Sequence, residues 1–139
     1  TERDKKGYKS ILDDIPVALP ELMRAIKLQK RAARVKFDWP NIDGVLDKII
    51  EESKELAKAI NTKSCESMRE EVGDLLFTLV NLSRKLNVDP ELALRATNTK
   101  FIKRFSYIEK TIDISGADIN NVAQSKLEEL WLKSKTIGL

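Results

Sequence analysis

The stretch EESKELAKAINTKSCESMREEVGDLLF, from residue 51 to residue 77, carries two pairs of carboxylates on either side of a short polar break. Glu52 and Glu55 precede the break, and Glu71 and Asp74 follow it. Residues three apart on a helix lie about 60° apart around its axis and about one turn along it, so each pair shares a face. Both pairs are symmetric about the break, so an antiparallel helical hairpin would bring all four carboxylates to one place.

Four carboxylates at one place predict a site for a divalent cation. Like charges that lie so close destabilise a fold unless protons or a cation intervene. Ligands that are all oxygen suit Mg²⁺ or Mn²⁺, and Mg²⁺ commonly shares its shell with waters and substrate phosphates. The sequence therefore indicates Mg²⁺ or Mn²⁺ as the cofactor.

A plainer interpretation of the second acidic pair stays open beside the metal site. The polar residues of its helix form one narrow stripe, and such a stripe is most often a solvated face: Glu71, Asp74, Thr78, Asn81 and Lys85. The apolar arc opposite is broad, with Phe77 and Val80 widening it, so the stripe would also suit the wall of a cleft. On the helix of the first pair, Glu51 and Glu55 also form an unfavourable i,i+4 pair of like charges. A helix optimised only for solubility would space such charges apart, so this crowding favours the metal site.

The elements that must position these residues are helical nearly throughout. Apolar residues at helical spacing, separated by turn and capping residues, predict an all-α antiparallel bundle of about five helices. Pro20 and Pro90 suit first helical positions. Ser64 or Ser67 can cap the third helix, and Asp89 the fourth. The predicted helices cover roughly residues 20–35, 43–60, 64–86, 90–112 and 122–135.

Length and composition exclude several classes of protein. The 139 residues suffice for one domain with its own core, which we place at 17–139 after a polar linker or loose arm at 1–16. The net charge of +3, with both signs interleaved, gives no nucleic-acid-binding patch. No apolar run approaches the roughly 20 residues needed to span a membrane. The single cysteine, Cys65, suits a cytoplasmic protein, and the lack of histidine leaves carboxylates as the side-chain general bases.

Several motifs resemble one protein family. EESKE followed by EVGD resembles the E-E-x-x-E … E-x-x-D pattern of the MazG-type, all-α nucleoside triphosphate pyrophosphohydrolases. LPELMRAIKLQKRAARVKFDWP, REEVGDLLFTLVNLSRKL, NTKFIKRF and LEELWLKSK are similar to the C-terminal module of bacterial MazG, so the resemblance covers roughly residues 17–135. Residues 1–16 resemble the connector before that module, which would explain a first residue other than Met. One departure is Lys36, where the family commonly has Gly, and it concerns the local turn rather than the metal site.

The resemblance implies an activity, a metal site and a catalytic assignment. The activity would be Mg²⁺-dependent hydrolysis of a nucleoside triphosphate to the monophosphate and pyrophosphate, with water attacking the α-phosphorus. Carried over by position, Glu52, Glu55, Glu71 and Asp74 would be the metal ligands. Glu52 or Glu55 would also act as the general base. A bound Mg²⁺ accords with this chemistry, because it neutralises phosphate charge and lowers the pKa of bound water.

Substrate contacts need cations and a stacking surface. Lys100 and Arg104 are i,i+4 on one predicted helix, where they are either an exposed cationic pair or, as the resemblance implies, phosphate contacts. Lys48, one turn before Glu52, is either an ion-pair partner of that acid or a phosphate contact. Trp131 either stacks on the base of the nucleotide or packs in the core.

The remaining expectations concern partners and rival functions. The helices leave a broad apolar face, and the resemblance implies a homodimer that completes the bundle and the site. Phe37 and Trp39 are interpreted as packing residues.

One rival function is a pyrimidine-specific pyrophosphatase acting on dUTP or dCTP. The other is a non-catalytic helical module that regulates or dimerises a longer chain, and the intact carboxylate quartet argues against it.

Overall fold

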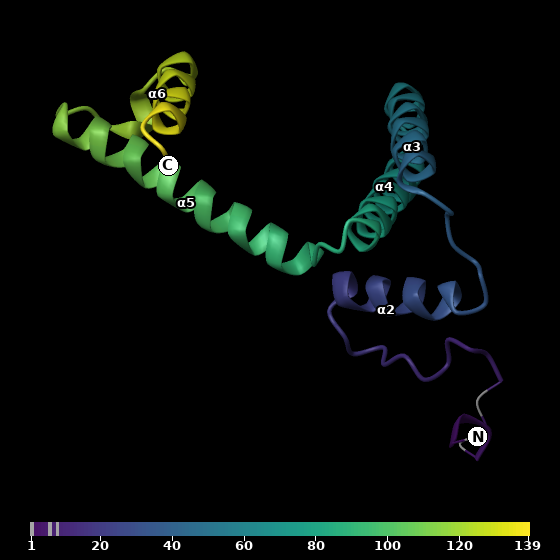
Figure 1. Ribbon diagram of the computed structural model, residues 1–139. Helices are drawn as coiled ribbons and strands as arrows, with labels where there is room; N and C mark the ends of the chain where they lie inside the picture. Colours follow the sequence, from purple (N-terminus) through teal and green to yellow (C-terminus); the bar gives the residue numbers. More distant parts are fainter. Residues whose placement is uncertain (1, 6, 8) are drawn as a thin grey trace. The chain divides into compact units, whose positions relative to one another are not determined.

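The computed structural model describes residues 2–5, 7 and 9–139, and these residues form helices without any strand (Figure 1). This confirms the all-α prediction. The longest helices, α3 to α5, include the two arms of the predicted hairpin. The elements in chain order are α1 (Glu2–Lys5), α2 (Glu21–Ala33), α3 (Ile42–Thr62), α4 (Cys65–Lys85), α5 (Pro90–Ile114), the 3₁₀ helix η1 (Ile119–Asn121) and α6 (Gln124–Thr136).

Short polar side chains begin the helices of the hairpin. The Asn41 side chain accepts a hydrogen bond from the Gly44 N–H at 2.9 Å and begins α3. Ser64 accepts one from the Ser67 N–H at 3.2 Å and begins α4. These bonds satisfy backbone donors that the first turn of a helix leaves without partners. Of the two serines that the sequence offered as caps for α4, Ser64 is therefore the cap.

Helices α3 and α4 form the predicted antiparallel hairpin. The turn between them is short because Lys63 adopts the left-handed conformation, with φ of 55°. Val45 and Ala59 from α3 and Val80 from α4 are buried. Helix α2 packs against α4 through the buried Gln29, whose Nε2 donates to the Phe77 carbonyl at 2.9 Å. The hairpin is thus held by an apolar interior and by polar contacts with α2.

The chain divides into two compact units, one reaching to Glu91 and the other covering 92–139. The hairpin and α2 belong to the first. The core of the second is formed by Ile108 and Ile112 of α5 and Leu130 of α6. Each unit therefore has buried apolar residues of its own.

The break between α2 and α3 contains a strained backbone position. Lys36 has φ of 67°, in the left-handed region that costs a side chain about 1 kcal/mol and that Gly adopts freely. Lys36 is the position where the MazG resemblance commonly has Gly. The structure therefore keeps the turn that Gly would favour, although Lys occupies it.

None of the described helices combines the length and the apolar character needed to cross a membrane.

Candidate metal centre

Three carboxylates from the two arms of the hairpin converge. Glu52 of α3 and Glu71 and Asp74 of α4 each offer an oxygen, and these oxygens lie within 4.8 Å of one another. Glu52 is buried, Glu71 is half-buried and Asp74 is exposed, so the group extends from the hairpin interior to its surface. Among the side chains that the structure describes, it is the one such group of acidic, Cys or His ligands close enough to share an ion.

The electrostatics of this group favour a cation. Partial burial, and then the negative charge and hydrogen bond of Glu52, raise the pKa of Glu71, and the charge of Asp74 adds to this effect. A raised pKa means that the folded site disfavours the ionised form of Glu71. A divalent cation would relieve this repulsion, and an all-oxygen donor set suits Mg²⁺ or Mn²⁺. The residues present therefore fit a metal site.

Lys48 forms an ion pair with Glu52, the buried member of the group. Its Nζ lies 2.9 Å from Glu52 Oε1 and 3.2 Å from Glu51 Oε1. The hydrogen bond to Glu52, followed by the one to Glu51, raises the pKa of the Lys48 ammonium. Of the two roles that the sequence offered for Lys48, the ion pair with Glu52 is present. Its role as a phosphate contact stays a prediction.

Glu55, the fourth predicted ligand, points its carboxylate elsewhere. Its Oε1 lies 3.3 Å from Nζ of Lys58, and its side chain is 43% exposed. The charge of Glu55 nevertheless contributes to the raised pKa of Glu71, so it lies within electrostatic reach of the group. The structure thus brings three of the four predicted carboxylates together, with the fourth beside them.

The middle of the polar stripe on α4 is not a solvated face. Thr78 is 4% exposed and Asn81 is 2% exposed. Thr78 Oγ1 donates to the Asp74 carbonyl, and Asn81 and Lys85 both donate to the Asp38 carboxylate, at 3.3 and 2.8 Å. The solvated-face interpretation is therefore wrong for the middle of the stripe, where Thr78 and Asn81 are buried and Asp38, from the chain between α2 and α3, lies against Asn81.

Asp38 is a residue that the sequence analysis did not single out. Its carboxylate accepts hydrogen bonds from Arg84 at 2.9 Å, Lys85 at 2.8 Å and Asn81 at 3.3 Å. Burial by itself would raise the pKa of Asp38, but the bonds from Lys85 and Arg84 outweigh it and hold the pKa below its ordinary value. The FDWP motif did not indicate a role for Asp38, because its hydrogen-bond partners lie more than 40 residues later in the chain.

The other predicted substrate residues lie in the second unit. The Arg104 guanidinium stands 5.2 Å from the ring centre of Trp131, and its Nε donates to the Leu139 carbonyl at 2.8 Å. Trp131 is half-buried and packs against Phe101, with ring centres 5.5 Å apart. Lys100 lies exposed one turn before Arg104 on α5. The second unit thus brings Arg104 and Trp131 together as a cation–aromatic pair.

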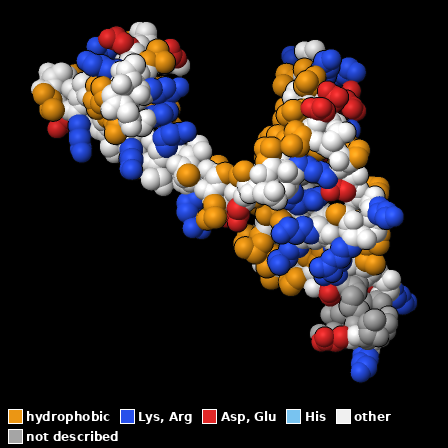
Figure 2. Space-filling view, viewed as in Figure 1, with side chains coloured by type: hydrophobic (Ala, Val, Ile, Leu, Met, Phe, Trp, Pro, Cys, Tyr) orange, Lys and Arg blue, Asp and Glu red, His pale blue; other side chains and the backbone are white. Residues whose placement is uncertain are grey.

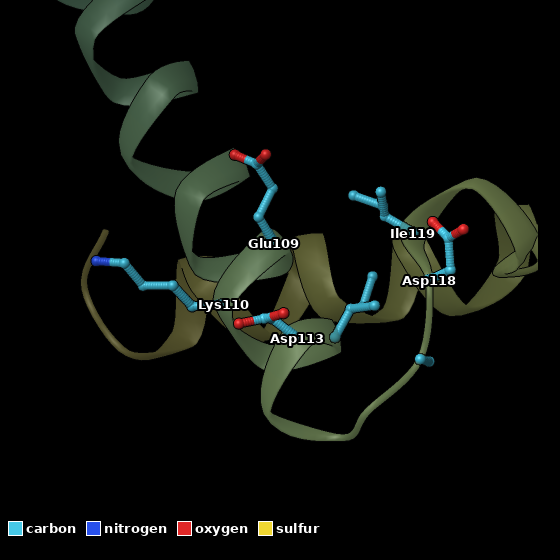
Figure 3. Close-up of a pocket in the computed structure, with 7 residues that line it drawn as sticks. Glu109, Lys110, Asp113, Asp118 and Ile119 are labelled. Atoms are coloured by element: carbon cyan, nitrogen blue, oxygen red, sulfur yellow. The ribbon is translucent and has the colours of Figure 1, made fainter.

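The second unit also has a cavity of about 420 Å³ at the end of α5, lined by residues 109, 110, 112, 113 and 117–119 (Figure 3). Figure 3 shows the carboxylates of Glu109, Asp113 and Asp118 set apart rather than converging. Asp118 also accepts the Asn120 N–H at 3.0 Å and so caps η1. This cavity therefore lacks the convergence of ligands found on the hairpin.

The fold and this site define a class of protein, an all-α module with a group of carboxylates that could hold a metal ion. Residues 41–108 match the family model of the MazG nucleotide pyrophosphohydrolase domain. Together with the relatives below, this match shows that the chain belongs to the MazG family. The resemblance noted from the motifs is confirmed.

Curated relatives match most of this chain. The nucleoside triphosphate pyrophosphohydrolase of Escherichia coli K12 is 42% identical over 136 residues, covering 96% of this chain and 52% of the relative. The Thermotoga maritima nucleoside triphosphate pyrophosphohydrolase/pyrophosphatase MazG is 44% identical over 133 residues, covering 94% and 51%. An uncharacterised Bacillus subtilis protein, YabN, is 41% identical over 127 residues, covering 91% and 26%. The chain spans about half the length of the first two relatives.

Proposed function

We propose that this chain hydrolyses nucleoside triphosphates to the monophosphate and pyrophosphate, with Mg²⁺ as cofactor and water attacking the α-phosphorus. The observation that carries the proposal is the convergence of Glu52, Glu71 and Asp74 within 4.8 Å at the hairpin. The names of the E. coli and T. maritima relatives support the same activity. The single cysteine, an exposed free thiol, accords with a cytoplasmic setting.

Each residue has a part in this reaction. Glu52, Glu55, Glu71 and Asp74 would hold the ion, and Glu52 or Glu55 would accept a proton from the attacking water. When bound, Mg²⁺ supplies charge neutralisation for the triphosphate and lowers the pKa of its water. Lys48 orients the Glu52 carboxylate through their 2.9 Å contact, and it is also a candidate phosphate contact.

Three more residues are candidate substrate contacts. Lys100 and Arg104 present cationic groups from the same side of α5, which suits phosphate oxygens. Trp131 offers an aromatic face on which a base can stack. These three assignments come from the family resemblance.

A homodimer is also part of the proposal. Hydrophobic side chains reach the surface over the hairpin (Figure 2), which is unusual for a face that stays in water. They recur at helical spacing on α3, on α4 and at the C-cap of α4, as expected of a helix–helix interface: Leu46, Ile50, Ile60, Val72, Leu76, Leu79 and Leu86. A second copy of this chain is the partner that such a stripe would pair with.

The test is product release from eight ribo- and deoxyribonucleoside triphosphates, with Mg²⁺ and with a chelator. The parent should release pyrophosphate and monophosphate in Mg²⁺ only. Glu52→Gln should lower kcat/KM at least about 100-fold, because it removes a charged ligand. Glu51→Gln is the matched control, because Glu51 is the neighbouring acid, also bonds Lys48 and lies outside the carboxylate group.

Three outcomes would count against the proposal. Orthophosphate as the first product would move the cleavage away from the α-phosphorus. Equal losses in Glu52→Gln and Glu51→Gln would mean that the carboxylate group is not the active site. No turnover by the folded protein in Mg²⁺ would favour the non-catalytic helical module.

A further inference from the structure

A glycine turn follows the last residues of α6 in the second unit. The Leu139 N–H donates to the Ser134 carbonyl at 3.1 Å, and the Gly138 N–H donates to the Lys135 carbonyl at 3.2 Å. Gly138 has φ of 89°, in the left-handed region. Two such bonds around a left-handed Gly form a Schellman motif, which provides donors for the last carbonyls of a helix. The motif gives Leu139 a defined position at the end of α6.

This turn is anchored to the core of the second unit. Ser134 is fully buried, and its Oγ donates to the Trp131 carbonyl at 2.6 Å. Leu130, one turn earlier on α6, is buried against Ile108 and Ile112 of α5. Because α5 and α6 share this core, the turn after α6 also has a defined position relative to α5.

The Leu139 carbonyl accepts a hydrogen bond from Arg104 of α5. The donor is Nε, at 2.8 Å, and the guanidinium also stands 5.2 Å from the ring centre of Trp131. A guanidinium is planar and has five N–H donors, of which this bond uses one. Neither Nη atom donates a hydrogen bond to a described residue. The two contacts therefore restrict the orientation of the Arg104 side chain and leave the Nη1 and Nη2 pair for another acceptor.

We propose that Gly138 is a positioning residue for phosphate binding by Arg104. Its turn presents the Leu139 carbonyl to Arg104 Nε, and this bond orients the Nη pair for a phosphate of the substrate. Two phosphate oxygens match such a pair, and bidentate bonds of this kind are both strong and directional. The proposal rests on the proposed function, in which Arg104 is a candidate phosphate contact.

Gly138→Ala and Gly116→Ala are a matched pair of variants. Both glycines belong to the second unit and follow the last turn of a helix, with φ of 89° and 78°. A Cβ at either position would meet nothing beyond the adjacent residues within 4 Å. Both substitutions therefore strain the backbone without a clash. Because only Gly138 belongs to the turn that contacts Arg104, a difference between the variants reports that contact.

The first measurement follows the Arg104 Nε–H by NMR in the whole, isotope-labelled chain. Its resonance is assigned by its loss in Arg104→Lys. Exchange of this proton with water should be at least about tenfold slower than that of the exposed Arg95 on the same helix. Gly138→Ala should remove this protection, whereas Gly116→Ala should keep it.

The second measurement tests phosphate binding without turnover. The probe is inorganic tripolyphosphate with Mg²⁺, and calorimetry measures its affinity. Gly138→Ala should weaken binding about fivefold, and Gly116→Ala should match the parent. In an Arg104→Gln background, Gly138→Ala should have no further effect, because the group on which it acts is absent.

Steady-state kinetics adds a third readout. Gly138→Ala should raise KM for nucleoside triphosphates about fivefold while kcat changes little, because the contact orients a group that binds phosphate. Gly116→Ala should change neither constant. Circular dichroism of both variants checks that they are folded to the same extent.

The positioning role and the proposed function can fail separately. Three results would overturn the positioning role even if the protein releases pyrophosphate: an unprotected Arg104 Nε–H in the parent, equal effects of the two glycine variants, or no tripolyphosphate binding by the parent. Tighter binding in Gly138→Ala would also overturn it, because the turn would then withhold Arg104 from phosphate. Weaker binding in Gly138→Ala that depends on Arg104, in a protein that releases no pyrophosphate, would support the positioning role and refute the proposed function.

Discussion

Replacing Asp38 with Asn tests what holds the chain between α2 and α3 onto the hairpin. Asp38 lies in that segment, whereas its donors Arg84, Lys85 and Asn81 lie in or directly beside the last turns of α4. The side chains of Asp38, Arg84 and Lys85 are 17%, 11% and 21% exposed, so solvent screens them only partly. Asn has nearly the same shape and keeps one acceptor, but it lacks the charge.

The magnitude follows from the two charge-assisted bonds. A hydrogen bond to a charged group contributes about 1.5–3 kcal/mol, and Asn retains part of each contact. We therefore expect Asp38→Asn to lower the free energy of unfolding by about 2 kcal/mol at pH 7. The pKa of Asp38 is lower in the folded protein than in an unfolded chain, so its contribution is present above about pH 4 and is lost as pH falls through the folded value.

Urea unfolding followed by circular dichroism, repeated from pH 7 down to about pH 2, measures this contribution. The difference between parent and Asp38→Asn should shrink as the pH falls below 4. Glu51→Gln is the control at pH 7, because the Glu51 side chain is 62% exposed and its ion pair should contribute less than about 0.5 kcal/mol. Equal midpoints for parent and Asp38→Asn at pH 7, or a difference that does not change with pH, would refute the reasoning.

Three further substitutions test other parts of the first unit. Lys36→Gly should raise the free energy of unfolding by about 0.5–1 kcal/mol, because φ of 67° suits Gly; a lower urea midpoint would contradict this. Ser64→Ala should cost about 1 kcal/mol by removing the cap of α4, whereas an equal loss in Ser67→Ala would argue against a specific cap. Glu71→Gln should raise the melting temperature in the absence of metal, because it removes the repulsion between carboxylates. It should also abolish any rise in melting temperature caused by Mg²⁺, because it removes a ligand. A rise with Mg²⁺ as large as that of the parent would exclude Glu71 as a ligand.

The helices and the hairpin were determined by local features of the sequence. Apolar spacing and capping residues depend on contacts within a few residues, and these predicted α3 and α4 within about two residues of their observed ends. The symmetry of the two acidic pairs about the turn then sufficed to predict that Glu52, Glu71 and Asp74 converge. Glu55 lies at the position that the pattern requires, but its side chain forms an ion pair with Lys58. Residue spacing does not determine which rotamer a side chain adopts, so the sequence could not predict this.

Only the tertiary structure decided what covers the polar stripe of α4. From the sequence, Thr78 and Asn81 suited a solvated face as well as a cleft, because periodicity defines a face but not what lies against it. The segment after α2 folds over that face, where Asp38 meets donors that lie more than 40 residues away in the chain. The same folding forms a cavity of about 510 Å³ against α4 and leaves Asn81 Oδ1 without a hydrogen-bond partner among the described residues. Such contacts depend on packing between distant segments, so no local pattern could have indicated them.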